Sequence, residues 1–250
     1  MPTTTQPDLV LCELERTPDP RHESHSPFCL KIHRALKSAG LRYTSRHGAM
    51  PASHRRHNPT GQVPVLLIDG EPVADSTEIL RRLARLRPTP TWADHPPAVL
   101  AEAMLWEELG DTALNGFLVA ARWADPRNWP RTKAAYFAKM PRPVAAVVPA
   151  LLRRRVVAAL RARDVWRAGP DACWRRFTDL LDDLELRAPQ ADFWLGDRLS
   201  PADLGLFAQL HALRHDLTPW QKQQIEARPR LTGWLDRVDA ATWPEGHPTP

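Results

Sequence analysis

The sequence contains little cysteine. Cys12, Cys29 and Cys173 are the three cysteines in 250 residues, and they lie far apart. This spacing excludes a disulfide framework and a cysteine-based zinc motif, and it fits a reducing compartment. The ten histidines show no paired ligand spacing supported by acids or cysteines, so we expect no metal site.

Long hydrophobic runs are also absent. The longest strongly apolar run, Val144 to Leu152, is interrupted by Pro149 and is followed by three arginines. It is far shorter than the ~20 residues that cross a bilayer. The first residues lack a basic segment followed by a long apolar one, so we infer no secretory signal. We therefore expect a cytoplasmic protein without a membrane span.

Neither sign of charge dominates strongly. The chain has 34 Lys and Arg against 29 Asp and Glu, a net charge of +5, and the two signs mix along most of the helical segments. This favours a solvated surface over a nucleic-acid-binding one, and we expect no nucleic acid partner. Hydrophobic residues make up 43% of the chain, enough for a buried core in one or two domains.

The first third of the chain predicts a small α/β domain over residues 9–87, after a flexible tail at 1–8. Residues 9–14 read as a strand, 15–25 as a loop with two prolines, and Ser26 to Gly40 as a helix. Strands follow at 41–47, 63–68 and 72–74, with a hairpin turn at Asp69-Gly70, and a helix begins near Asp75. This order of strands and helices can form a complete α/β sandwich.

The remainder of the chain predicts only helices. A linker with four prolines spans 88–97, and an all-helical domain spans 98–244. Apolar periodicity and proline or glycine breaks place helices at 98–122, 131–139, 143–163, 170–186, 200–215 and 220–240. Ser200 and Asp203 form the pattern of a capping box, which is a structural feature.

Three short motifs carry candidate chemistry. Ser26-Pro27-Phe28-Cys29 opens the first helix, where unpaired N–H groups and the helix dipole favour a thiolate, and where a serine can also be a simple N-cap. Gly61-Gln62-Val63-Pro64 leads into a strand. Asp75-Ser76 begins the next helix, where N–H and hydroxyl groups suit a carboxylate and the Asp75 carboxylate suits an ammonium group.

In this order and spacing, the motifs resemble those of the glutathione S-transferase superfamily. The resemblance implies a fold class of an α/β thioredoxin-like N-terminal domain plus an all-α C-terminal helical bundle. It implies a cis peptide bond before Pro64, and Val63 pairing through its main chain with the cysteinyl part of glutathione. Ser26 then corresponds to the residue that activates the thiol of glutathione, and Cys29 to the second cysteine of glutaredoxin-like relatives.

The resemblance further implies a bound glutathione co-substrate, a small hydrophobic electrophile and a homodimer. Asp75 and Ser76 would hold the γ-glutamyl group of glutathione. Its glycine carboxylate would meet a basic residue among His54, Arg55, Arg56 and His57, with Gln62 as a further candidate. Five tryptophans could line the acceptor site between the domains, although such residues more often belong to a core: Trp106, Trp123, Trp129, Trp166 and Trp174.

Two features leave alternatives to a transferase open. The loop between Leu14 and Ser26 is long and carries prolines, which resembles the branch of the superfamily that contains metaxins and the failed axon connections protein. Members of that branch imply a glutathione-binding or scaffold protein without turnover. Cys29 also allows a thiol–disulfide oxidoreductase, although its position is the less exposed one in the motif.

Overall fold

The structure, a computed structural model, describes residues 6–86, 88–138, 140–163 and 165–243. The predicted tail at 1–8 falls largely outside these residues; within it, Gln6 Nε2 donates to the carbonyl of Arg42 at 2.6 Å. The chain divides into two compact units. The first contains the residues up to 108 together with 191–208 and those from 236 onward, and the second contains 109–190 and 209–235.

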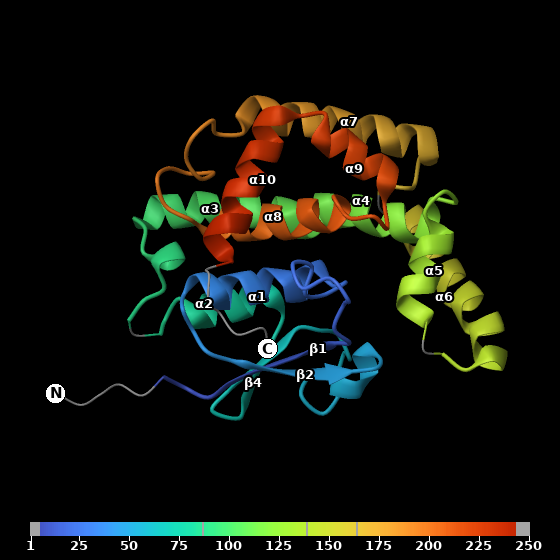
Figure 1. Cartoon of the computed structure of the whole chain (residues 1–250), viewed down its shortest axis with the longest axis horizontal. Helices are drawn as coiled ribbons and strands as arrows, with labels where there is room; N and C mark the ends of the chain where they lie inside the picture. Colours follow the sequence, from blue (N-terminus) through green and yellow to red (C-terminus); the bar gives the residue numbers. More distant parts are fainter. Residues whose placement is uncertain (1–5, 87, 139, 164, 244–250) are drawn as a thin grey trace. The chain divides into compact units, whose positions relative to one another are not determined.

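The first unit is built on a four-stranded sheet in the order β2-β1-β3-β4 (Figure 1). The strands are β1 (Leu9–Leu14), β2 (Thr44–Gly48), β3 (Val65–Ile68) and β4 (Glu71–Ala74). β1 pairs with β2 in parallel and with β3 in the antiparallel sense, and β3 and β4 form a hairpin. The two central strands, β1 and β3, are the apolar and buried ones, as expected for strands covered on both faces.

Two helices, α1 (Pro27–Ser38) and α2 (Ser76–Leu83), pack together beside this sheet (Figure 1). α1 begins where Ser26 caps it and Pro27 occupies its first turn, and the chain leaves it through Gly40 at a φ of 64°. Its apolar residues Leu30, Ile32, Ala35 and Leu36 are buried. The sequence therefore predicted the elements of this layer correctly: β1 has the predicted bounds, and the other boundaries differ by at most three residues.

The stretch predicted as a linker is anchored to α1. It forms a 3-10 turn at Thr91–Ala93, and the Trp92 indole, 1% exposed, donates a hydrogen bond to the carbonyl of Ala35 at 3.1 Å. α3 (Pro97–Leu109) follows. The start of α8 (Pro201–Leu213) belongs to the same unit, and there the main-chain N–H and hydroxyl of Ser200 both bond the Asp203 carboxylate, at 2.9 and 2.7 Å. One half of the predicted capping box is therefore confirmed, the bond from the Ser200 N–H to the Asp203 side chain, and the hydroxyl adds a second bond to the same carboxylate.

The second unit is helical. The predicted helix at 98–122 continues past α3 through α4 (Asn115–Val119), which lies between two π-helical turns, Gly110–Leu114 and Ala120–Ala124. α5 (Trp129–Phe137), α6 (Arg142–Arg163) and α7 (Pro170–Arg187) come next. The single helix predicted at 220–240 is wrong, because the chain forms α9 (Pro219–Glu226) and α10 (Pro229–Thr242), separated just before Pro229, which lacks the N–H that would continue α9.

Tryptophans of the second unit pack on one another. Trp166 and Trp174 have ring centroids 5.7 Å apart, and Trp174 also lies 5.6 Å from Trp220. Trp123 and Trp129 form another pair, at 5.8 Å. Trp166 is buried, whereas Trp123, Trp129 and Trp174 are half-buried, so these four tryptophans form aromatic clusters that are partly open to solvent.

Candidate functional site

The strand register brings two of the three motifs to one end of the sheet. Val65 pairs with Ala74 across the β3–β4 hairpin, so Pro64 and Asp75 continue the two strands side by side. Cys12 pairs with Val65 on the other side of β3, so the end of β1 at Leu14 lies at the same end. The Leu14 main chain also lies against the Cys29 thiol, which adds the first turn of α1 to this group.

Ser26 is the N-cap of α1. Its Oγ accepts a hydrogen bond from the Cys29 N–H at 3.4 Å, and its carbonyl accepts the first helical bond, from Leu30 N–H at 3.0 Å. Its side chain is partly exposed. An exposed hydroxyl at the positive end of a helix dipole is suited to donate a hydrogen bond to a thiolate.

Cys29 is fully buried one turn further along. Burial raises the pKa of the Cys29 thiol far above its ordinary value, and the negative charge of Glu13 adds to this rise. The hydroxyls of Ser26 and Ser24 bond the sulfur and only partly oppose it. Ser24, which the sequence did not single out, is itself buried and accepts the Ser26 N–H at 3.3 Å. The thiol is therefore a poor nucleophile in this fold.

The Val63–Pro64 peptide bond is cis. The turn before it is held by Asn58, whose side-chain amide donates to the carbonyl of Gln62 at 2.9 Å, and Gly61 enters it at a φ of 73°. The side chain of Arg55 lies over Gly61, with its Nε 3.1 Å from the position a Cβ would take there. Arg55 and Gln62 are both exposed, so this turn places a cation beside an exposed amide.

The other basic residues of this loop are arranged differently. His54 is 4% exposed, and its Nε2 bonds the carbonyl of Glu13 at 2.9 Å, so it fastens the loop to β1. Arg56 donates to the His57 ring at 2.8 Å. Of the four predicted candidates for a carboxylate ligand, His54 is thus occupied within the protein, and Arg55 is the one that lies over the turn before Pro64.

Asp75 caps α2 from a φ of 76°. Its Oδ1 accepts the N–H groups of Thr77 and Glu78, at 2.9 and 3.2 Å, and the residue is exposed. Ser76 is 3% exposed in the first turn of the helix. Asp75 is therefore the N-cap of α2 through Oδ1, and Oδ2 is the oxygen for which the structure describes no cap bond.

A buried ion pair that the sequence did not predict supports this end of α2. Lys31 Nζ lies 2.5 Å from Glu107 Oε1, and both side chains are fully buried. The Thr77 hydroxyl donates to the same oxygen at 2.8 Å. α1, α2 and α3 are thus joined directly beneath the Asp75 cap. A side chain at Gly205 would meet the main chain of Glu107 at 2.9 Å, so α8 approaches α3 closely at this point.

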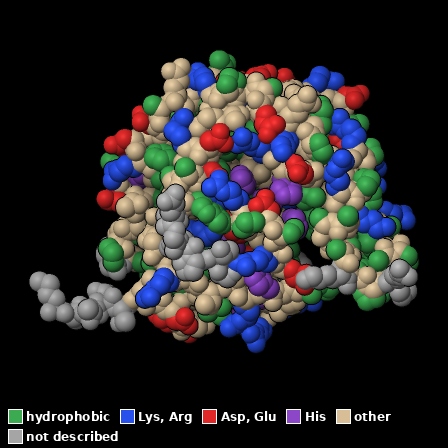
Figure 2. All heavy atoms as spheres, in the orientation of Figure 1, with side chains coloured by type: hydrophobic (Ala, Val, Ile, Leu, Met, Phe, Trp, Pro, Cys, Tyr) green, Lys and Arg blue, Asp and Glu red, His purple; other side chains and the backbone are tan. Residues whose placement is uncertain are grey.

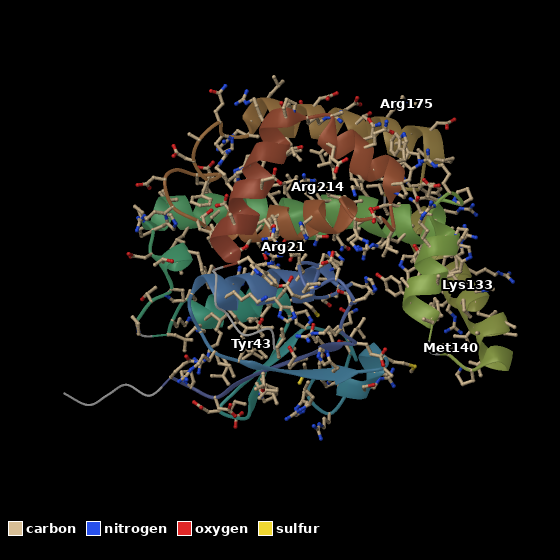
Figure 3. The ribbon with its side chains drawn as sticks, viewed as in Figure 1. Arg21, Tyr43, Lys133, Met140, Arg175 and Arg214 are labelled. Carbon is tan, nitrogen blue, oxygen red and sulfur yellow. The ribbon has the colours of Figure 1, made fainter. Side chains whose placement is uncertain are left out.

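The long loop before Ser26 is fixed by buried cations of α1. Lys37 Nζ lies 2.8 Å from Glu23, and Arg34 Nη2 donates to the carbonyl of Arg21 at 2.7 Å. Arg34 Nη1 also lies 2.6 Å from Asp239 at the end of α10 (Arg21 is labelled in Figure 3). The loop therefore packs into the first unit, with Glu23 and Ser24 buried next to the start of α1.

Glu13 is the buried acid at the end of β1. His33 lies 2.9 Å from it and 2.7 Å from the Tyr43 hydroxyl (Figure 3). Burial alone would raise the pKa of Glu13, but the charge and hydrogen bond of His33 outweigh it, so the pKa is lowered. A small cavity beside Glu13 contains none of the predicted glutathione residues; its lining is Glu13, Arg16, Asp19, Pro20, Glu23, His33, Ser45 and His47.

Within the described ranges, no group of three or more His, Cys, Asp or Glu side chains could hold a metal ion. The three cysteines are free and buried. No described helix combines the length and the apolar content that crossing a bilayer requires.

Comparison with known proteins gives two matching family models. Residues 25–86 match the family "Glutathione S-transferase, N-terminal domain", and residues 145–237 match "Glutathione S-transferase, C-terminal domain". The Failed axon connections protein of Drosophila melanogaster is 24% identical over 97% of the chain, and the match spans 60% of that protein's length.

Solved structures show the same fold. The β-etherase LigF of Sphingobium sp. strain SYK-6 is 23% identical with a TM-score of 0.67, over 93% of this chain and 95% of that one. Rice GST1, solved in complex with glutathione, is 21% identical with a TM-score of 0.60, over 94% and 87%. The predicted fold class is confirmed. The two matched domains, in this order and on this fold, show that the chain belongs to the glutathione S-transferase superfamily.

Proposed function

We propose that the protein binds glutathione at the end of the sheet formed by Leu14, Pro64 and Asp75, and transfers its thiolate to a hydrophobic electrophile. The observation that supports this most strongly is the contrast in the first turn of α1. Ser26 is partly exposed at the helix N-terminus, whereas Cys29 is fully buried with a raised pKa. A hydroxyl, and not a protein thiol, is thus the group available to a bound sulfur.

In this proposal, Ser26 donates a hydrogen bond to the sulfur of glutathione and the dipole of α1 stabilises its negative charge. Both effects lower the pKa of the bound thiol, so more thiolate is present at neutral pH. The thiolate attacks the electrophilic carbon, a carbon–sulfur bond forms, and the leaving group departs with the electron pair of the broken bond. The main chain of Val63 pairs with the cysteinyl part of glutathione.

The two ends of glutathione would be held by separate charges. The exposed Asp75 carboxylate meets the γ-glutamyl ammonium group, and Ser76 at the start of α2 meets the γ-glutamyl carboxylate. Arg55, over the turn before Pro64, meets the glycine carboxylate, with Gln62 beside it. We further propose a homodimer, as in transferase relatives, which light scattering tests directly.

Ser26 has two roles that substitutions can separate. Ser26→Asp keeps an acceptor for the Cys29 N–H and so keeps the cap, but it removes the donor and places a negative charge beside the thiolate. We expect normal thermal stability without ligand, and loss of conjugation with 1-chloro-2,4-dinitrobenzene. Ser38→Ala, at the other end of α1, is the matched control and should leave conjugation unchanged. Full conjugation activity in Ser26→Asp would contradict the proposal.

Arg55 can be tested by changing both partners. The glycine monoethyl ester of glutathione lacks the negative charge of the glycine carboxylate, which is the group that Arg55 would meet. The wild type should therefore bind glutathione more tightly than the ester, whereas Arg55→Ala should bind the two with nearly equal affinity. A charged hydrogen bond contributes about 1.5–3 kcal/mol, which corresponds to roughly ten- to a hundredfold discrimination in the wild type. Arg56→Ala, the exposed neighbour bonded to His57, should keep the wild-type discrimination.

Glutathione binding without turnover is a second candidate. The packing of Glu23 and Ser24 immediately before Ser26 favours it, because a buried loop at this position restricts what can approach the thiol. Stabilisation by millimolar glutathione with no conjugation of any generic electrophile would support this candidate. No stabilisation at all would exclude both.

A further inference from the structure

A single segment of the second unit accounts for the net positive charge of the molecule. Between Asp125 and Asp164 the sequence has ten Lys or Arg residues and no Asp or Glu. The whole chain has a net charge of only +5, so the rest of it is acidic overall. This segment comprises α5 and α6, and Lys133 is labelled on α5 in Figure 3. Such an asymmetry marks a surface for an anionic partner.

The same segment exposes aliphatic side chains in a helical stripe. Five residues of α6 are between 37% and 56% exposed: Val144, Val147, Val148, Leu151 and Leu152. With 3.6 residues per turn, their spacing of three, four, seven and eight residues places them on one face. We call this face, together with Arg154 and Arg155, the α6 outer face. Figure 2 shows hydrophobic and basic side chains adjoining one another where Figure 1 places α5 and α6.

The opposite face of α6 attaches the helix to the second unit. Pro149 is buried and Leu160 is 4% exposed. The guanidinium of Arg153 donates to the carbonyls of Trp123 and Ala124, at 2.8 and 3.3 Å, and lies 4.9 Å from the centre of the Trp129 ring. The usual polarity of a surface helix is therefore reversed: an arginine is on the inner side and the aliphatic residues are on the outer side.

The arginines beside the stripe are available to a partner. Arg154, Arg155 and Arg161 are exposed, and in the part of the chain that the structure describes none of them forms an ion pair. Arg155 lies within the outer face, and Arg154 and Arg161 lie along one border of it. A partner that fits this face must offer an apolar environment to the aliphatic side chains and negative charge to the arginines beside them.

From these observations we propose that the α6 outer face docks onto the surface of an anionic lipid bilayer. The aliphatic side chains enter the boundary between headgroups and acyl chains, and the arginines contact lipid phosphates. Nucleic acid would leave the five aliphatic side chains without an apolar partner. A second copy paired through the same face about a twofold axis would bring like-charged arginines toward one another. This docking does not depend on glutathione binding.

Vesicle flotation tests the proposal on the full chain. We expect binding to vesicles of phosphatidylcholine mixed with phosphatidylserine, weak binding to phosphatidylcholine alone, and weaker binding as salt is raised. Leu151→Asp should reduce partitioning into the anionic vesicles at least about tenfold. Leu186→Asp, at a leucine of α7 that is 75% exposed against 51% for Leu151, is the control and should have no effect.

Charge is tested in the same way. Arg154→Glu should reduce partitioning about fivefold or more, whereas Arg175→Glu, an exposed arginine on α7, should not (Figure 3). Circular dichroism confirms that each variant is folded. The proposal is overturned if the wild type does not bind anionic vesicles, or if the α7 variants weaken binding as much as those of α6. It is also overturned if an oligonucleotide binds the wild type more tightly than the vesicles do.

Discussion

Replacing Lys31 by methionine would leave a carboxylate without its cation in the interior of the first unit. Lys31 and Glu107 are both fully buried and 2.5 Å apart, and Glu107 also accepts the Thr77 hydroxyl at the start of α2. Water cannot replace the missing charge there. Removing one partner of a buried pair typically costs about 3–5 kcal/mol, which for a chain of this size lowers the melting temperature by roughly 6–20 °C.

The double variant Lys31→Met/Glu107→Gln separates charge from packing. It removes both charges and keeps an amide oxygen for Thr77, so we expect its free energy of unfolding to return to within about 1 kcal/mol of the wild type. The double variant should thus be more stable than Lys31→Met alone. Urea titration followed by circular dichroism measures all of these values.

The exposed pair between Glu78 and Arg81 on α2 provides the internal control. Its side chains are 57% and 54% exposed, so Arg81→Met should cost at most ~0.5 kcal/mol. The reasoning is refuted if Lys31→Met costs no more than the Arg81 variant. It is equally refuted if the double variant loses as much stability as Lys31→Met and Glu107→Gln lose together when made singly. The two charges would then act independently.

Three further predictions concern single residues. Native protein should resist alkylation at Cys29, which is buried with a raised pKa, and react there only after unfolding; mass spectrometry after iodoacetamide treatment would show this. The lowered pKa of Glu13 means that its contribution to stability is present above the ordinary glutamate pKa and is lost as the pH falls. The free energy of unfolding should therefore fall less steeply with falling pH in Glu13→Gln than in the wild type. Identical dependences on pH in the two proteins would contradict the assignment. Gly205→Ala should lower the free energy of unfolding by about 1–3 kcal/mol, because its Cβ would meet the Glu107 main chain at 2.9 Å. Gly116→Ala, whose Cβ would touch only Val165 at 3.4 Å, should not destabilise the protein in the same thermal assay.

Local signals in the sequence were sufficient for the elements that carry the motifs. Ser26 and Pro27 show where α1 begins, Asp69-Gly70 shows the hairpin, and Asp75 shows the start of α2. In each case the cause is a backbone property of the residue itself or of its immediate neighbours. The proximity of Pro64 and Asp75 then follows from the hairpin register, which the short turn fixes.

The buried charges could not be predicted in this way. Lys31, Arg34 and Lys37 lie opposite the apolar side of α1, and their spacing is typical of a solvated helix face. Lys31 and Arg34 pair with Glu107 and Asp239, both remote in sequence, and Lys37 pairs with Glu23 of the loop before α1, so the burial of all three depends on the folded chain. The same limit applies to α6, whose apolar periodicity indicates a helix but not the side that faces solvent.

The partners of Arg34 also determine when the first unit can be completed during synthesis. This fully buried guanidinium needs Glu23 and the Arg21 carbonyl, which are made early, and the Asp239 carboxylate, which follows Arg34 by 205 residues. A nascent chain that stops before α10 contains the whole sheet but leaves a cation without one of its two acids. The first unit is therefore completed only after α10 has been made, although the three motifs all lie in the first third of the sequence.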